Sequence, residues 1–346
     1  MFSSPEHDHE VAALMTKTNP LSSSDPLPFS WQSIPDKEFR MTLKPTRRGF
    51  LQKSMAFAAT GLVYETSLAK TKTAPLIDTH LHCFAGDKDS RFPYHKRAPY
   101  RPEQSATPEH LLTCMDGAGV DFAVVVHPEP YQDDHRYLEH CLKTGNGRLK
   151  GSMLLFSDRD GSLEKMPDLV KRLDVVTARV HAYAPGRLPP FGKPELKRLW
   201  RMASELNLAV QLHFEPRYAS GFEPLIREFR DTRVIIDHLG RPFQGTPKEH
   251  AVVMEWAKLP NTVMKLSSIP SERSYPHRDI RPIIRNLTDA FGASRMIYGG
   301  GFNADATPES YQSAFARARS YIDHLSESEQ AQILGGTAAK LYGFGE

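Results

Sequence analysis

Eight short runs of apolar and β-branched residues alternate with longer amphipathic stretches from Ala74 to the end of the chain. This alternation is typical of βα units, which build a parallel sheet. The runs occupy residues 75–82, 121–128, 149–156, 175–183, 208–214, 233–240, 261–269 and 295–301. Eight repeats in about 270 residues match one closed barrel. The sequence therefore predicts an α/β fold, a single (β/α)8 TIM barrel with extra C-terminal helices.

A doubly wound open sheet is the competing architecture, but it would have fewer strands and a glycine-rich first turn, which this chain lacks. The connection over residues 83–106 is longer than the others and mixes basic with aromatic side chains. Loops of this length in a compact domain are usually lids or binding loops. We expect this loop to have one of these roles.

The segment Thr46–Lys70 places Arg47 and Arg48 before a short apolar run, and it departs from the usual twin-arginine pattern only at Gln52. We expect residues 41–70 to be a twin-arginine (Tat) signal peptide that directs the protein to the periplasm or outside the cell. A basic linker is the alternative. The apolar run is too short for a stable membrane anchor, so the export machinery would be a transient partner.

Met41 opens this signal-like segment, whereas residues 1–40 show no apolar periodicity. We therefore expect translation to start at Met41, with residues 1–40 a disordered or mis-assigned extension. Residues 71–346 would then form the barrel domain.

Charge and cysteine content exclude several classes of function. The net charge of +3 is small, and the basic residues are scattered, which argues against nucleic acid as a partner. The three cysteines form no CxxC pair and suggest neither a disulfide framework nor a cysteine zinc site. The oligomeric state stays open.

Histidines gather where the predicted strands end. Six of the fifteen lie there: His80, His82, His127, His181, His213 and His238. The carboxyl ends of the strands carry the chemistry in barrels of this kind, so the set indicates a functional site. For His127 or His181 taken alone, a core histidine bonded to backbone carbonyls is an equal alternative.

Alternate residues of a strand share a face, so His80 and His82 can converge on one ion. Neutral imidazoles bind zinc, and a catalytic zinc takes three protein ligands, for which His213 is the natural third. The same alternation turns a further set of polar side chains inward: Asp78, Arg179, Gln211, Lys265 and Ser267. The resulting pocket is polar and positively charged, and it suits a small anionic substrate.

The stretches IDTHLH, VQLHF, IIDHLGRP, MKLSS and ILGGTAAKLYGF resemble the amidohydrolase-related (amidohydrolase 2) family over about residues 75–343. An HxH pair alone is a weak signal, but histidines ending the fifth and sixth strands in this order make it strong. The family includes sugar-lactone and 2-pyrone-4,6-dicarboxylate lactonases, and also decarboxylases of aromatic or muconate-type acids. The resemblance implies a (β/α)8 barrel.

Carried over by position, the resemblance implies roles for individual residues. His80, His82 and His213 would bind a divalent metal, with zinc expected and manganese, iron or nickel left open. His238 would position or deprotonate the attacking water, and Arg179 and Lys265 would hold the carboxylate or carbonyl oxygen of the substrate. The predicted substrate-binding set is Arg179, His181, Gln211, Lys265, Ser267 and His127.

The end of the eighth strand departs from the family, because it reads YGGGFNADAT and places Gly301 where the family has an aspartate. That aspartate is the usual metal ligand and general base. Asp305 lies four residues on and is a candidate catalytic replacement. The alternative is that Asp305 caps the helix that begins near Pro308.

The leading prediction is a metal-assisted hydrolase that opens a lactone or a related carbonyl ring in a small carboxylated or sugar-derived molecule. The DHLGRP and KLSS stretches favour a lactone over an amide. A non-oxidative decarboxylase, in which His238 protonates the carbanion, is the second candidate. A periplasmic binding protein that lost its chemistry with the aspartate is the third.

Overall fold

The computed structural model describes residues 74–183, 187–271, 273 and 275–345. The predicted extension, residues 1–40, and the predicted signal peptide, residues 41–70, lie outside these ranges. No helix in the described part of the chain is both long enough and apolar enough to cross a membrane.

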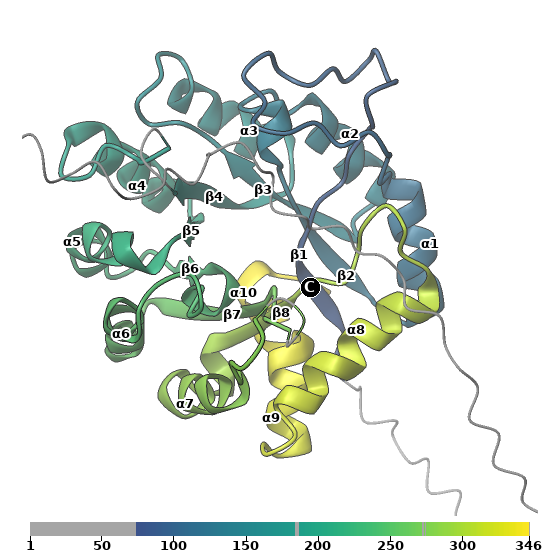
Figure 1. Ribbon diagram of the computed structural model, residues 1–346. Helices are drawn as coiled ribbons and strands as arrows, with labels where there is room; N and C mark the ends of the chain where they lie inside the picture. The colour runs from purple at the N-terminus through teal and green to yellow at the C-terminus, as the bar shows by residue number, and fades with distance from the viewer. Residues whose placement is uncertain (1–73, 184–186, 272, 274, 346) are drawn as a thin grey trace, which may run out of the picture. The chain divides into compact units, whose positions relative to one another are not determined.

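Eight parallel strands form one sheet in the order of the sequence, and they surround the centre of the domain in Figure 1. They are β1 (Ile77–Leu81), β2 (Phe122–Val126), β3 (Leu149–Leu154), β4 (Val175–Ala182), β5 (Ala209–Phe214), β6 (Val234–Ile236), β7 (Thr262–Ser267) and β8 (Met296–Gly299). Each strand lies within the run predicted for it. The (β/α)8 barrel is therefore confirmed.

Side-chain hydrogen bonds join the last strand to the first and bring the barrel close to closure. Thr79 Oγ1 donates to the carbonyl oxygen of Tyr298 at 2.6 Å, and the amide of Gly300 donates to Asp78 Oδ1 at 2.8 Å. Tyr311 also donates to Asp78, over 2.8 Å from its hydroxyl to Oδ2. Burial raises the pKa of Asp78 to about 6. Asp78 thus serves the β1–β8 seam.

Helices follow the strands and form the outer layer (Figure 1). They are α1 (Pro108–Ala118), α2 (Arg136–Gly145), α3 (Met166–Arg172), α4 (Pro194–Glu205), α5 (Glu223–Glu228), α6 (Pro247–Glu255), α7 (Arg281–Phe291), α8 (Pro308–Tyr321), α9 (Glu327–Ala331) and α10 (Thr337–Tyr342). Local sequence explains several starts, since Thr107, Thr246 and Thr307 each cap a helix whose first residue is proline. The predicted extra C-terminal helices are α9 and α10.

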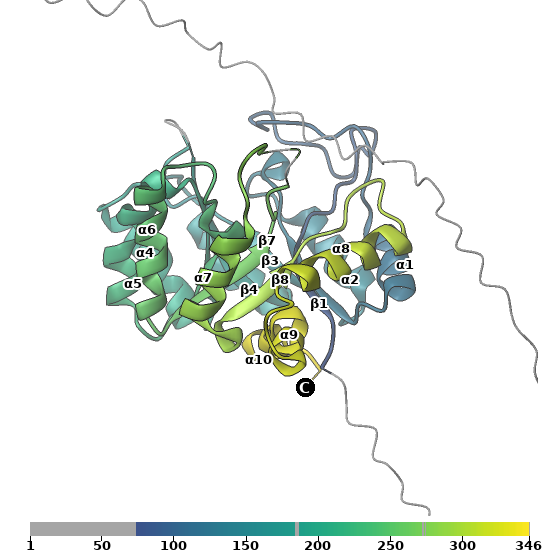
Figure 2. The same ribbon diagram turned by 60° about the horizontal axis from the view of Figure 1, so that its bottom comes forward.

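Apolar side chains fill one end of the barrel. Ile77, Val124, Ile235 and Ile297, near the starts of their strands, pack with α10 residues such as Tyr342. In Figure 2, α9 and α10 lie at the end away from the long connecting loops. Because this end is closed by hydrophobic packing, a polar site has room only at the carboxyl ends of the strands.

The long connection predicted over residues 83–106 follows β1 at that polar end. Phe84 and Ala106 pair with each other through backbone hydrogen bonds of 2.9 and 2.8 Å, which bring the two ends of the loop together. Tyr100 within it is 46% exposed, a large value for an aromatic side chain. Its role as a lid or binding loop stays a prediction.

Candidate functional site

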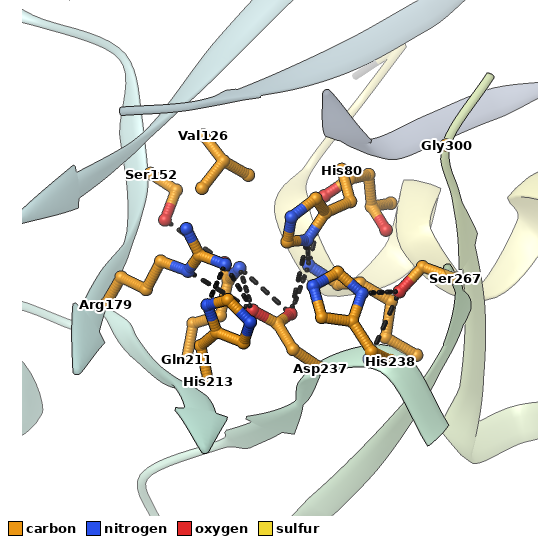
Figure 3. A network of polar contacts seen from close by, with 12 residues as sticks. His80, Val126, Ser152, Arg179, Gln211, His213, Asp237, His238, Ser267 and Gly300 are labelled. Atoms are coloured by element: carbon orange, nitrogen blue, oxygen red, sulfur yellow. Dashed lines mark hydrogen bonds and ion pairs between the residues drawn. The ribbon is translucent and has the colours of Figure 1, made fainter. Parts of the chain in front are cut away.

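Buried polar side chains converge at the carboxyl ends of the strands. Figure 3 shows Asp237 between Arg179 and His213 on one side and His80 and His238 on the other. These residues come from β1, β4 and β5 and from the turn that follows β6. The strand-end prediction thus located a cluster of polar groups within the domain.

Asp237 is the centre of this cluster. Its Oδ1 lies 3.2 Å from Lys265 Nζ and 3.3 Å from His80 Nδ1, and its Oδ2 lies 3.1 Å from Arg179 Nη2. Burial would raise the pKa of Asp237, but Lys265, His80 and Arg179 hold it well below its ordinary value. Asp237 is therefore a fixed negative charge.

Gln211 holds the carboxylate of Asp237 in place. Its Nε2 donates to both carboxylate oxygens of Asp237, at 3.0 and 2.9 Å. Its Oε1 accepts from Ser152 at 3.1 Å and from Thr177 at 3.2 Å. Gln211 is completely buried, so the structure places this predicted substrate-binding residue among protein groups.

Lys265 is likewise completely buried. Its Nζ donates to the carbonyl oxygen of Thr79 at 3.0 Å in addition to its contact with Asp237. Burial lowers the pKa of Lys265, and Asp237 opposes that effect. Lys265 therefore acts on the site mainly through its charge and its support of β1.

His80 in β1 and His82 just after it each direct Nδ1 toward an oxygen atom. His82 Nδ1 lies 2.7 Å from the carbonyl oxygen of Val126, and His80 Nδ1 lies against Asp237. Burial lowers the pKa of both rings, so both are neutral near pH 7. With Nδ1–H donated to an oxygen, each ring keeps Nε2 as a free acceptor, as metal-binding histidines do.

His238 sits in an unusual backbone turn. His238 and Leu239 have φ of 58° and 59°, and Arg241 has φ of 54°, all in the left-handed region. Gly240 follows at 66°, where an added Cβ would lie 2.6 Å from Val253. Non-glycine residues adopt this conformation at a cost, often where function requires it.

The turn places the His238 ring over the site. Ser267 Oγ lies 2.8 Å from Nδ1 of His238 and accepts from its backbone amide at 3.2 Å. Ser267, predicted to bind substrate, therefore holds the predicted general base. The ring centroids of His238 and His80 are 4.5 Å apart.

His213 is surrounded by cations and a phenol. Its Nδ1 lies 2.8 Å from Arg179 Nη2 and 2.8 Å from the Tyr183 hydroxyl, and its Nε2 contacts Arg241. Burial and the charge of Arg179 lower the pKa of Arg241 to about 10, so it stays protonated at neutral pH. Both ring nitrogens of this predicted metal ligand already have protein neighbours.

Of the remaining predicted residues, His181 joins an outer group. Its Nδ1 lies 3.0 Å from Glu129 Oε1. His127 is completely buried, and its Nε2 lies 2.9 Å from the carbonyl oxygen of Gln132. That contact is the core-histidine arrangement named as the alternative for His127. Its role in substrate binding stays a prediction.

One group of donors fits a divalent metal. Among the described residues, His80, Asp237 and His238 have ligand atoms within 4.8 Å of one another. His82 is not among these three, but its ring lies beside them, with its centroid 5.2 Å from that of His80. Imidazole and carboxylate donors suit zinc and related ions. The His213 ring also lies beside this group, with its centroid 4.8 Å from that of His238, so its role as a ligand stays a prediction.

The end of β8 takes a course of its own. A Cβ added to Gly301 would lie 2.7 Å from Ala314 Cβ and 2.9 Å from Tyr311 Cδ2, so this position faces α8. Asp305 is exposed, and Thr307 rather than Asp305 caps α8. The helix-capping alternative for Asp305 is therefore wrong, while its catalytic role stays a prediction.

Sequence reasoning gave no role to Asp237, Tyr183, Arg241 or Glu129. Asp237 and Arg241 stand in the quoted DHLGRP stretch, and that is the signal that could have found them. Strict alternation puts Asp237 and His238 on opposite faces. Because β6 ends at Ile236 and the chain turns left-handed, both side chains reach the site.

Comparisons with known proteins agree with the family resemblance seen in the sequence. A family model described as amidohydrolase matches residues 77–344. The chain is 27% identical over 228 residues to 4-sulfomuconolactone hydrolase of Rhizobium radiobacter, covering 64% of this chain and 73% of that protein. It is 26% identical over 261 residues to L-fucono-1,5-lactonase of Burkholderia ambifaria, covering 68% and 84%.

Solved structures share the fold. A probable 2-pyrone-4,6-dicarboxylic acid hydrolase from Acinetobacter baumannii, with citric acid bound, has a TM-score of 0.62 and 21% identity over 78% of this chain and 99% of that one. An amidohydrolase from Burkholderia multivorans with bound zinc has a TM-score of 0.61 and 18% identity over 78% and 100%. At such identities the likeness shows the fold alone.

Proposed function

Because this chain belongs to the amidohydrolase family, we propose that it is a hydrolase that opens the ring of a small lactone. The curated relatives named above are lactone hydrolases, which supports a lactone as the substrate class. The observation that carries the proposal is a neutral, tethered His238 beside a buried cluster of charges. That arrangement supplies a base next to positive charge, which ester hydrolysis requires.

The charge balance of the cluster favours an anionic substrate. Arg179, Lys265 and Arg241 bring three positive charges against the single negative charge of Asp237. This leaves an excess of two positive charges, and a carboxylate or sulfonate near Arg241 would offset one of them in a poorly solvated place. The centroid of the Tyr183 ring lies 4.9 Å from the Arg241 guanidinium carbon, which is within cation–π distance.

The proton steps fall to His238. In the tautomer whose Nδ1–H donates to Ser267, Nε2 accepts a proton from water as the water oxygen adds to the lactone carbonyl carbon. The ring C–O bond then breaks, and the same proton passes to the departing ring oxygen. The positive charges of Arg179 and Lys265 stabilise the oxyanion that forms between these steps.

A divalent metal, with zinc proposed, would be held by the predicted ligands His80 and His82 together with the neighbouring donors Asp237 and His238. When bound, such an ion polarises a carbonyl and makes water more acidic. The test is elemental analysis of protein purified without chelators or a histidine tag, compared with the His80→Ala, His82→Ala double variant. One equivalent in the wild type and none in the variant is expected. Equal metal in both would contradict these ligands.

The activity itself is tested on a lactone panel with zinc or manganese added. It should contain carboxylated and sulfonated muconolactones, a pyrone dicarboxylate and 1,5-lactones of sugar acids. We expect acid release without carbon dioxide, followed by pH-stat and gas detection. Carbon dioxide release would favour the decarboxylase. Tight binding without turnover would favour the binding protein.

A further inference from the structure

A second polar group lies beside the cluster and plays no part in the steps above. Glu129 follows β2, and its Oε1 lies 3.0 Å from Nδ1 of His181 at the end of β4. The separation is within hydrogen-bonding distance, although the donor and acceptor are not well aligned. Arg187 Nη1 donates to the other oxygen of Glu129 at 2.9 Å. Glu129 thus connects His181 to Arg187.

The charge of Glu129 decides which nitrogen of His181 carries the proton. Burial would raise the pKa of Glu129, but His181, Arg187 and Arg179 lower it to about 2, so the carboxylate is ionised at neutral pH. A carboxylate only accepts hydrogen bonds, and therefore Nδ1 carries the hydrogen. Burial lowers the pKa of His181 as well, which leaves Nε2 with a lone pair.

That lone pair lacks a partner. His181 is 9% exposed, and its Nε2 is buried without a hydrogen-bonding neighbour among the described residues. Buried polar atoms of this kind are uncommon in native proteins unless water or a ligand satisfies them. A group with an O–H or N–H is therefore expected at this position.

The position belongs to the same site. The His181 ring lies 5.1 Å from that of His213, which lies 4.8 Å from that of His238, measured between centroids. A substrate held beside His238 and Arg241 extends toward His181 across His213. The free Nε2 is thus within the site but away from the reacting bond.

We propose that Glu129 and His181 select lactones that carry a free hydroxyl group, whose O–H donates to His181 Nε2. Glu129 is a positioning residue, because it acts through His181. This inference rests on the proposed function and adds a substrate class to it. A site that hydrogen-bonds a substrate hydroxyl discriminates strongly against analogues that lack it, since its own polar atom is then left unpaired.

Glu129→Gln provides the test. Arg187 retains the amide oxygen, so the new NH2 group faces Nδ1 of His181 and moves the ring hydrogen to Nε2. We then compare kcat/KM for a hydroxylated 1,5-lactone and its single O-methyl ethers, because an ether oxygen can accept from Nε2–H but cannot donate to a lone pair on Nε2. The ratio in favour of the hydroxylated lactone should fall by about tenfold or more for at least one analogue. A ratio is insensitive to the fraction of folded enzyme.

Glu215→Gln is the matched control, because Glu215 pairs with Arg217 at 2.8 Å after β5 and undergoes the same chemical change. Its ratio should equal that of the wild type. An unchanged ratio in Glu129→Gln, with the wild type active, would overturn the proposal and leave the proposed function intact. It would mean that water alone satisfies Nε2.

Nitrogen-15 spectra of the imidazoles separate the two failures, with His181→Gln used for assignment. The wild type should carry its His181 proton on Nδ1, and Glu129→Gln should carry it on Nε2. A proton on Nε2 in the wild type would overturn the proposal whatever the turnover. A wild type that opens no lactone would overturn the proposed function and hydroxyl selection together, and the spectra would still decide whether Glu129 positions His181.

Discussion

Asp237 offers the most direct test of the cluster at the scale of single residues. Asp237→Asn preserves the size of the side chain but removes the charge that Lys265 and Arg179 share. Removal of one partner from a buried ion pair typically costs about 3–5 kcal/mol, because the remaining charge stays buried. We expect a loss of this size in the free energy of unfolding, measured in urea, together with loss of lactone turnover.

Asp305→Asn is the comparison for that variant, since Asp305 is exposed in the turn before α8. Surface substitutions usually change stability by less than about 0.5 kcal/mol. We expect unchanged stability. Because the proposed mechanism gives the proton steps to His238, we also expect little change in kcat. If kcat collapses while stability is unchanged, Asp305 is the base that replaces the missing aspartate, as the sequence left open.

Glu129 gives the protein a definable dependence of stability on pH. The folded pKa is about 2 and the ordinary value is 4.5, so the ionised form stabilises the fold above pH 4.5 and this contribution is lost as pH falls toward 2. The difference corresponds to about 3 kcal/mol. The side chain is only 12% exposed, so solvent screening is limited.

The measurement is urea unfolding of the wild type and Glu129→Gln from pH 3 to pH 7. The stability difference should grow from pH 3 to about pH 5 and stay constant above it. Glu164→Gln, which removes an exposed partner of Arg198, should show a much smaller trend, because solvent screens that pair. A difference for Glu129→Gln that is the same at all pH values would show that its carboxylate pKa is not lowered by folding.

The end of β8 carries the prediction at the scale of elements. Gly301 has φ of 118°, and a Cβ there would collide with Ala314 and Tyr311 of α8. Gly301→Asp therefore strains the backbone and overpacks the contact with α8. We expect destabilisation by about 2 kcal/mol or more in urea unfolding, without a gain in bound metal.

Gly147→Asp separates the two causes, because Gly147 also has a positive φ, of 85°, but an added Cβ meets nothing within 4 Å. Its smaller loss measures strain alone. The opposite result, a stable Gly301→Asp that binds metal more tightly, would show that the position still faces the site.

The strands were predictable because their apolar runs are separated by clear helical patterns, and each observed strand lies inside its run. The turn after β6 was not. Residues 233–240 were predicted as one strand, yet the strand ends at Ile236 and His238 adopts a left-handed conformation. Contacts with Ser267 and Val253, distant in sequence, hold that turn, so local propensity gives no sign of it.

The site was predictable in composition but only partly in connection. Strand parity brought His80, His82, Gln211 and Lys265 to the barrel interior. Strand parity does not show which inward side chains bond to one another. Gln211 and Lys265 were therefore expected to contact the substrate, whereas in the structure both contact Asp237. The partners of a buried charge depend on the whole barrel.

At the scale of the whole molecule, the barrel is apolar at the amino ends of its strands and polar at their carboxyl ends. Helix α10 covers the apolar end through Tyr342 and its neighbours. The polar end therefore faces the loops that follow the strands, including residues 83–106.

We propose that the protein is exported to the periplasm as a folded enzyme by the twin-arginine route, guided by Arg47 and Arg48. Replacing both with lysine should leave the protein in the cytoplasm, folded and active, because neither lies in the described barrel. Cell fractionation followed by turnover assays measures this. Arg40→Lys is the control: if translation starts at Met41, this residue is absent from the protein and export is unchanged. A wild-type protein found only in the cytoplasm would contradict export, and Arg47 and Arg48 would then belong to a basic linker.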